Sequence, residues 1–146
     1  MPFFDSQALV PQPNFDDRDF WASCDHRLLR FQCCALCQQA RHPPMPVCPH
    51  CRSLKVGWQD SCGQGTVFTF TVVHHASHEA VKPKLPYVVA VIIPDDVSGV
   101  RWVSNITDIP SEDVHIGMSV EVWWDEVMPG RFVPRCRPLA AQALKK

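Results

Sequence analysis

Two C-x2-C pairs constrain the fold of this chain more than any other feature. Cys34 and Cys37 form the first pair, Cys48 and Cys51 form the second, and ten residues separate them. A two-residue gap lets one tight turn direct two sulfurs towards the same point, and two such turns complete a tetrahedral four-sulfur shell. Since protein fills all four positions of that shell, the spacing predicts a structural zinc ion and disfavours a catalytic one.

Three alternatives to this ligand set remain open from the sequence. The first alternative is a redox dithiol, but such a site needs a single C-x2-C pair, whereas this chain has two. Iron can replace zinc in a four-thiolate site. Cys33 can replace Cys34 only by making the two spacings unequal. The remaining cysteines are isolated and are expected as small buried apolar side chains; they are Cys24, Cys62 and Cys136.

The segment between the two pairs is rich in proline, which favours an extended return strand and disfavours a helix. We therefore interpret residues 32–60 as a rubredoxin-like zinc ribbon. Residues 1–5 lack the basic and apolar regions of a signal peptide. The chain also lacks an apolar run of the roughly 20 residues that span a bilayer. A cytoplasmic protein without a membrane partner is the expectation.

The patterns on either side of the ribbon predict a mainly β protein with one N-terminal helix. Residues 1–31 are expected to form an extended arm followed by a helix over Asn14–Phe31, where apolar residues recur at spacings of three and four. Residues 61–138 contain five β-rich runs: Gly65–His75, Tyr87–Ile93, Val100–Ile106, Ser119–Val127 and Arg131–Arg137.

Five mostly antiparallel strands with a short helical link after the third fit a five-stranded OB-type barrel. That link is expected near Ser111–Val114. An open sandwich is the alternative arrangement of the same strands. Residues 139–146 are expected to be a tail, with some helical character.

In the fourth expected strand, the alternation of side chains predicts which indole faces the core. Val120, Val122 and Trp124 share one face, so Trp124 is expected inside the barrel. Trp123 is then expected outside, covered by the N-terminal arm or by a partner protein. Asp125 is interpreted as a turn residue at a strand end.

The chain shows no nucleophile–base pair at a recognisable spacing. His74, His75 and His78, followed by Glu79, form the most suggestive polar group. Because neighbouring residues of a strand face opposite sides, His74 and His75 are expected as the polar end of a strand and not as metal ligands.

The charge balance argues against non-specific nucleic-acid binding. The chain has 14 Lys and Arg against 15 Asp and Glu, a formal net charge of −1. OB folds that bind nucleic acid use a basic groove with stacking aromatic residues, and only the aromatic residues are evident. Nucleic-acid binding therefore remains an alternative function. Lys82 and Lys84 are expected in a solvated loop, or against a CoA phosphate or an acidic partner.

Several short motifs occur in an order that resembles a known family. They are Phe20-Trp21, Leu28-Leu29-Arg30-Phe31, the two cysteine pairs, Trp58, Gly63-Gln64-Gly65-Thr66-Val67, Pro86-Tyr87, Ile116-Gly117-Met118 and Val133-Pro134. The order resembles that of acyl-CoA-associated proteins in which a rubredoxin-like zinc ribbon is fused to an OB fold. The resemblance implies structural zinc on Cys34, Cys37, Cys48 and Cys51.

The resemblance also implies partners and a role. Members of this family pair with thiolase-fold proteins, which include thiolases, hydroxymethylglutaryl-CoA synthase-like enzymes and side-chain aldolases of steroid breakdown. The chain looks most like small subunits of bacterial multicomponent acyltransferases that acetylate phloroglucinol derivatives by C–C bond formation. It is thus expected to be a non-catalytic scaffold in a hetero-oligomer. The alternatives are a stand-alone acyl-CoA-binding protein and a thiolase or aldolase partner in lipid or steroid degradation.

Overall fold

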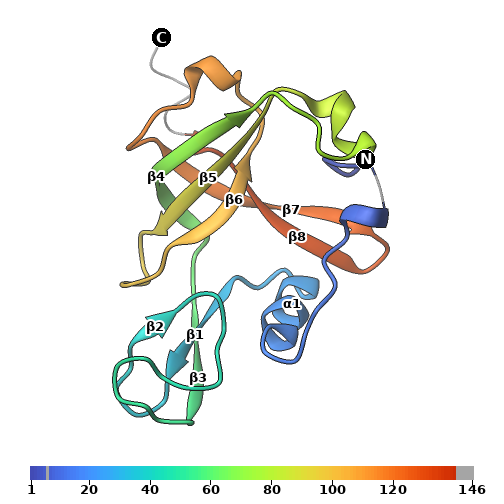
Figure 1. Cartoon of the computed structure of the whole chain (residues 1–146). Helices are drawn as coiled ribbons and strands as arrows, with labels where there is room; N and C mark the ends of the chain where they lie inside the picture. Colours follow the sequence, from blue (N-terminus) through green and yellow to red (C-terminus); the bar gives the residue numbers. More distant parts are fainter. Residues whose placement is uncertain (6, 141–146) are drawn as a thin grey trace.

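The computed structural model describes residues 1–5 and 7–140, arranged as a small three-stranded sheet and one α-helix below a closed barrel (Figure 1). The helices are η1 (Gln7–Leu9), α1 (Arg18–Asp25), η2 (Glu79–Lys84) and η3 (Ser111–Asp113), where η marks a 3-10 helix. The strands are β1 (Arg30–Cys34), β2 (Ala40–Arg41), β3 (Val56–Asp60), β4 (Gln64–Val73), β5 (Tyr87–Pro94), β6 (Trp102–Ile106), β7 (Ser119–Met128) and β8 (Arg131–Pro138).

The barrel confirms the predicted mainly β fold. Its strands close in the order β4-β5-β6-β8-β7, and each overlaps one expected strand in chain order. The helical link is η3, a single 3-10 turn between β6 and β7. The expected tail lies largely outside the described residues, since it includes residues 141–146. No helix of the described chain is long and apolar enough to cross a membrane.

The helix is much shorter than the expected Asn14–Phe31, for a reason visible at both of its ends. The Asn14 side chain accepts the N–H groups of Asp16 and Asp17, which forms a turn before the helix begins. At the other end Arg27 adopts φ 57°, and its N–H bonds to the Cys24 carbonyl. The next N–H, of Leu28, bonds to the Ser23 carbonyl, and the two bonds form a Schellman stop.

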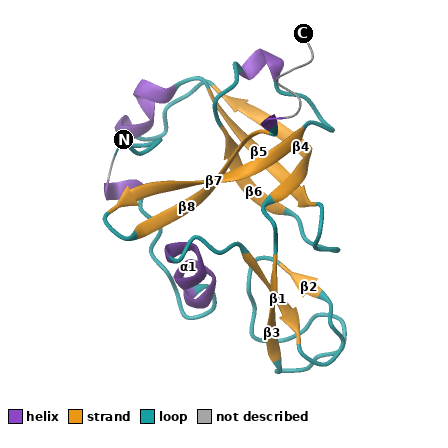
Figure 2. Ribbon diagram, turned by 180° about the vertical axis from the view of Figure 1, so that it is seen from behind, coloured by secondary structure: helices purple, strands orange, loops and turns teal. Residues whose placement is uncertain are grey.

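The residues beyond this stop form a strand of the ribbon. Phe31 belongs to β1, which pairs with β2 on one side and β3 on the other. The expected boundary between the N-terminal segment and the ribbon, placed between residues 31 and 32, therefore falls inside β1. The return segment contains only a two-residue strand, β2, where a longer extended strand was expected. Figure 2 shows that this sheet lies below the barrel, with α1 beside it and under the β7–β8 hairpin.

Phe31 connects the ribbon to the barrel. Its side chain is fully buried, and its ring centroid lies 6.3 Å from that of Trp102 in β6 and 5.5 Å from that of His42. The ring of Phe20 in α1 also packs against His42, with the two ring centroids 4.9 Å apart. Burial lowers the pKa of His42 to about 4, so this ring is neutral near pH 7. The core of the barrel thus continues into the ribbon and the helix.

β4 and β5 approach so closely at Gly65 that a side chain has no room there. A Cβ at this position would lie 2.7 Å from Cγ2 of Ile92 and 2.7 Å from the carbonyl oxygen of Ile93. The glycine therefore permits the tight start of the β4–β5 ladder, in which Gly65 pairs with Pro94.

The barrel is weakly closed at one seam. β6 and β8 run parallel there and pair only at Ile106 and Cys136 among the described residues. The Ser104 hydroxyl adds a bond of 3.0 Å to the carbonyl of Pro134. Further along, the two strands diverge, which leaves a gap in the barrel wall that backbone hydrogen bonds do not span.

The two adjacent indoles follow the predicted alternation. Trp124 packs against the hydrophobic core, as expected. Trp123 is half-buried on the other face, and its indole N–H donates to the Thr107 hydroxyl at 2.8 Å. The side chain that we expected a partner or the arm to cover is thus held in part by the barrel itself.

Asp125 is not the turn residue that the sequence suggested. It lies inside β7, is 1% exposed and forms an ion pair with Arg135 of β8, which is 6% exposed. Burial lowers the pKa of Arg135, and its hydrogen bond to Asp125 opposes that shift. The N-terminal arm completes the arrangement, because the Phe3 N–H donates to both carboxylate oxygens of Asp125 at 3.2 and 3.1 Å.

We predict that Asp125→Ala lowers the free energy of unfolding by about 3–5 kcal/mol, because it leaves a buried guanidinium without its counter-ion. Glu121→Ala is the matched control, since Glu121 bonds Arg137 across the same two strands at 3.0 Å but in a more exposed position. Its effect is expected to stay below about 1 kcal/mol. Urea denaturation of both variants measures the difference, and equal losses would contradict the role of the buried pair.

Candidate metal centre

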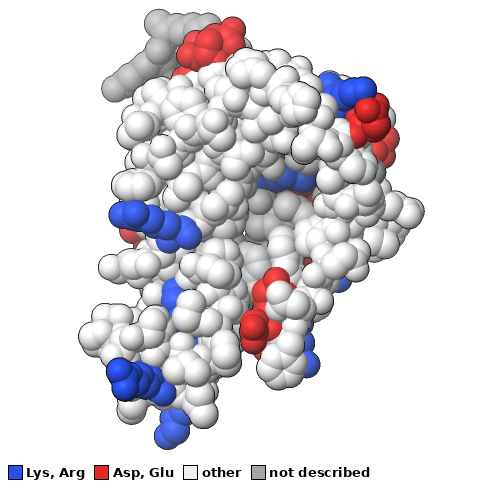
Figure 3. Space-filling model, in the orientation of Figure 1, with Lys and Arg blue, Asp and Glu red and all other residues white. Residues whose placement is uncertain are grey.

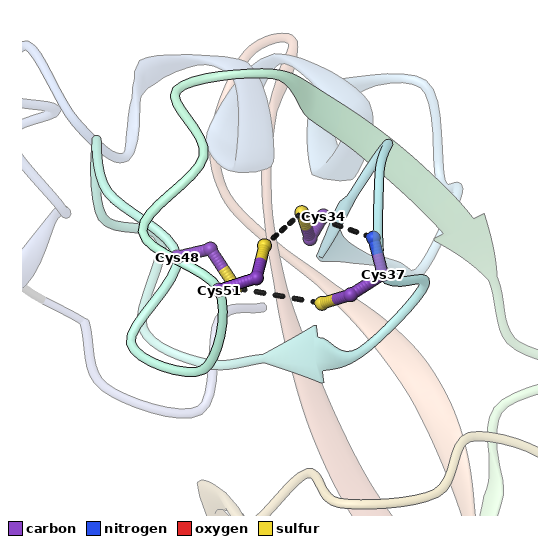
Figure 4. Close-up of side chains that lie close together, drawn as sticks. All are labelled: Cys34, Cys37, Cys48 and Cys51. Carbon is purple, nitrogen blue, oxygen red and sulfur yellow. Dashed lines mark hydrogen bonds between the residues drawn. The ribbon is translucent and has the colours of Figure 1, made fainter.

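The four predicted sulfurs converge at the tip of the ribbon. Cys34 ends β1, Cys37 lies in the turn that follows, and Cys48 and Cys51 lie in a second turn between β2 and β3. All four sulfur atoms are within 4.8 Å of one another. The closest pairs join the two turns: Cys34 to Cys51 at 3.5 Å and Cys37 to Cys48 at 3.6 Å (Figure 4).

These distances fit a tetrahedral metal site. A zinc ion bound at about 2.3 Å by four thiolates places neighbouring sulfurs about 3.8 Å apart. Four soft thiolate donors in tetrahedral geometry suit zinc or iron, and leave no coordination position for water or substrate. The arrangement can therefore hold the ribbon together but offers no Lewis-acid site for chemistry.

Backbone N–H groups in the turns stabilise the thiolate form. The N–H groups of Leu36 and Cys37 point at the Cys34 sulfur, at 3.3 and 3.4 Å. The Cys37 N–H makes the larger contribution and lowers the pKa of Cys34 to about 6. In the second turn, the N–H of Cys51 likewise lowers the pKa of Cys48. Each turn thus prepares its first cysteine for a metal ion.

The two turns share a backbone feature that the sequence did not reveal. The residue after each pair, Gln38 or Arg52, has positive φ, 65° and 63° respectively. Its N–H bonds to the carbonyl of the first cysteine, at 3.0 Å for Cys34 and 2.9 Å for Cys48. A glycine at either position would have indicated the positive φ in the sequence, but neither residue is glycine.

Cys33 lies outside the cluster. It is buried on the opposite side of β1 from Cys34, and a Cβ at Gly57 would lie 3.2 Å from its sulfur. Its role is packing against β3. His50, inside the second turn, is exposed and is not part of the cluster.

The isolated cysteines are poor nucleophiles in two of three cases. Burial raises the pKa of Cys24 and of Cys136 to about 12, so both are neutral thiols at neutral pH. Cys62 is exposed, contrary to the expectation that it is buried, in a loop where the Asp96 carboxylate accepts the Cys62 backbone N–H at 2.6 Å.

The histidine group does not converge. His74 and His75 are exposed, just beyond the end of β4. His78 caps η2, where its Nδ1 accepts the Ala80 N–H at 3.1 Å. Within the described part of the chain, the four cysteines form the single cluster that could hold a metal ion.

Comparisons with known proteins agree with the barrel and the ribbon. Residues 58–125 match the family model described as the ChsH2 C-terminal OB-fold domain. A probable enoyl-CoA hydratase alpha subunit of Thermomonospora curvata is 38% identical over 93% of this chain, which spans 42% of that protein. A DUF35 domain-containing scaffold protein of Methanocaldococcus jannaschii is 38% identical over 60% of this chain and 61% of its own length.

A solved structure extends the likeness to the whole described architecture. A chain of the structure titled Ltp2-ChsH2(DUF35) aldolase superposes with a TM-score of 0.79 and 36% identity, over 88% of this chain and 98% of that chain. The chain therefore belongs to the ChsH2/DUF35 family of OB-fold proteins with a zinc-ribbon-like cysteine cluster.

Proposed function

We propose that this chain is a non-catalytic, zinc-binding scaffold subunit that joins thiolase-fold subunits in a multicomponent acyltransferase. The observation that carries the proposal is the 36% identity to a chain of an aldolase assembly, over 98% of that chain. A relative described as a scaffold protein supports the same role. The thiolase-fold partner would supply the nucleophilic cysteine and bind the acyl donor.

The chemistry of the described residues supports a scaffold more than an enzyme. A four-thiolate shell has no open coordination position. Cys24 and Cys136 are buried thiols with a pKa of about 12. His74 and His75, beyond β4, are exposed, and neither forms the nucleophile–base pair that covalent catalysis requires among the described residues.

Structural zinc is part of the proposal. The ribbon sheet has only three short strands, so four metal–sulfur bonds supply stability that its small core cannot. The proposal also places the protein in a reducing, cytoplasmic compartment, because cysteines bind metal only while they are reduced.

The acyl substrate is the finer part of the proposal. The order of short motifs along the chain favours an acyltransferase that acetylates phloroglucinol-type acceptors, with thiolase-fold and hydroxymethylglutaryl-CoA synthase-like subunits as partners. A second candidate is a partner of an aldolase or a hydratase, which the two relatives described as an aldolase and as a hydratase subunit favour. Lipid or steroid degradation is the setting that the family resemblance implies for such a partner. Purification from the native organism, followed by mass spectrometry of the bound proteins, distinguishes the two by the class of enzyme recovered.

We predict that the purified chain contains about one zinc or iron ion per molecule and that Cys37→Ser or Cys48→Ser releases it. Losing one thiolate opens the shell and weakens the link that the metal makes between the two turns. Cys62→Ser is the control, since Cys62 is exposed and outside the cluster. Elemental analysis after gel filtration measures the metal, and unchanged content in both ligand variants would refute the site.

We predict that the isolated chain does not transfer acyl groups and that an assembled complex loses its activity when this subunit is removed. Substitution of His74, His75 or Cys62 should change the turnover of the complex by less than about tenfold, since none belongs to a catalytic pair. Steady-state kinetics on complexes checked for composition measures this. A loss of about a thousandfold from one substitution in an intact complex would place the chemistry in this chain.

A further inference from the structure

A cavity of about 230 Å³ opens where β6 and β8 diverge; we call it the seam cavity. It lies between α1 and the barrel, and Figure 3 shows a hollow near the middle of this face with basic atoms inside it. Its apolar lining comes from α1, β5, β6 and β8 and comprises Phe20, Trp21, Val89, Trp102, Val103 and Val133. Asn105 and Arg135 are among its polar residues.

Arg135 is the one Lys or Arg side chain of the described residues that lines this cavity, and it is only partly satisfied. A guanidinium carries five N–H groups. Its Nε donates to Asp125 and one Nη1 hydrogen donates to Asn105, which leaves three N–H groups without a hydrogen-bond partner in the described chain. An unpaired charged donor in a buried position is costly.

The Nη2 atom, which carries two of these free N–H groups, is open to solvent. Although Arg135 is only 6% exposed, none of its side-chain nitrogen atoms is both buried from solvent and without a hydrogen-bond partner. Among the described residues, such atoms belong only to Arg41 and His42. On the arm side, the rings of Phe3 and Phe4 lie 5.1 and 5.2 Å from the guanidinium carbon. The arm therefore covers part of the guanidinium, and the seam cavity provides an approach to the same group.

We propose that the seam cavity binds a small aromatic carboxylate. The carboxylate accepts charge-assisted hydrogen bonds from the free N–H groups of Arg135, a pairing that suits the planar guanidinium. The ring packs against the aromatic and aliphatic lining. A single guanidinium, already paired with Asp125, favours a singly charged carboxylate over a doubly charged phosphate.

This inference goes beyond the scaffold role and does not depend on it, because it concerns the isolated full-length chain. The probes are benzoate and 2-naphthoate, which carry one and two rings, and benzamide, which keeps the benzoate ring but has no charge. Titration is followed by the NMR signals of the indole N–H groups. We expect saturable shifts for Trp21 and Trp102, and benzamide binding at least about tenfold weaker than benzoate, because it lacks the charge-assisted bonds.

Two variants test the location without disturbing the buried ion pair. Val103 lines the cavity and is 62% exposed, so Val103→Asp adds a like charge beside the bound carboxylate, and we expect a loss of affinity of about tenfold or more. Ile93→Asp is the matched control, since Ile93 is an exposed residue of the neighbouring strand outside the cavity lining. Its affinity should match that of the natural chain.

Three results would overturn the proposal. The first is the absence of saturable indole shifts with either carboxylate. The second is equal affinity for benzoate and benzamide, which would exclude recognition of the carboxylate by Arg135. The third is an equal loss in the two variants, which would place binding elsewhere on the barrel. The first two comparisons use the natural chain, so they do not depend on the folding of a variant.

Discussion

The meeting of four cysteine sulfurs at one point constrains the ribbon and, through β1, its packing on the barrel. Cys34 ends β1, so a metal ion at the cluster fixes the position of that strand. Phe31 lies three residues upstream and enters the core beside Trp102. The ribbon is thus held by thiolates at one end and by hydrophobic burial at the other. Metal binding and the packing of the ribbon on the barrel are, for this reason, physically linked.

The seam between β6 and β8 is the complementary weak point. A barrel that closes through one residue pair needs other contacts along the gap, and the hydrogen bond from Arg135 of β8 to Asn105 of β6 supplies one of them. The N-terminal arm adds a backbone bond to Asp125 and two rings over Arg135. The divergence of β6 and β8 also opens the seam cavity. Arg135 therefore contributes both to the closure of the barrel and to the lining of the cavity.

Local pattern predicted the metal centre and the barrel strands but not the ends of the helix. The cysteine spacing is a local property of two turns, and β-rich runs separated by turn residues identify strands directly. The helix instead ends at Asp25, and just beyond it Arg27 adopts a left-handed conformation that arginine seldom adopts. The same applies to Gln38 and Arg52 in the metal-binding turns, where no glycine marked the positive φ.

The sequence by itself determined which four cysteines cluster, the mainly β class and the inward face of Trp124, because each depends on the spacing of nearby residues. Tertiary structure alone decided that Asp125 is buried, that the arm meets it 122 residues away in the chain, and that β6 and β8 diverge. Burial of a carboxylate depends on whether a guanidinium is placed to neutralise it, and the β7–β8 hairpin places Arg135 there. The cover over this pair comes from the N-terminal arm, through the Phe3 N–H and the rings of Phe3 and Phe4, and no local pattern encodes that contact.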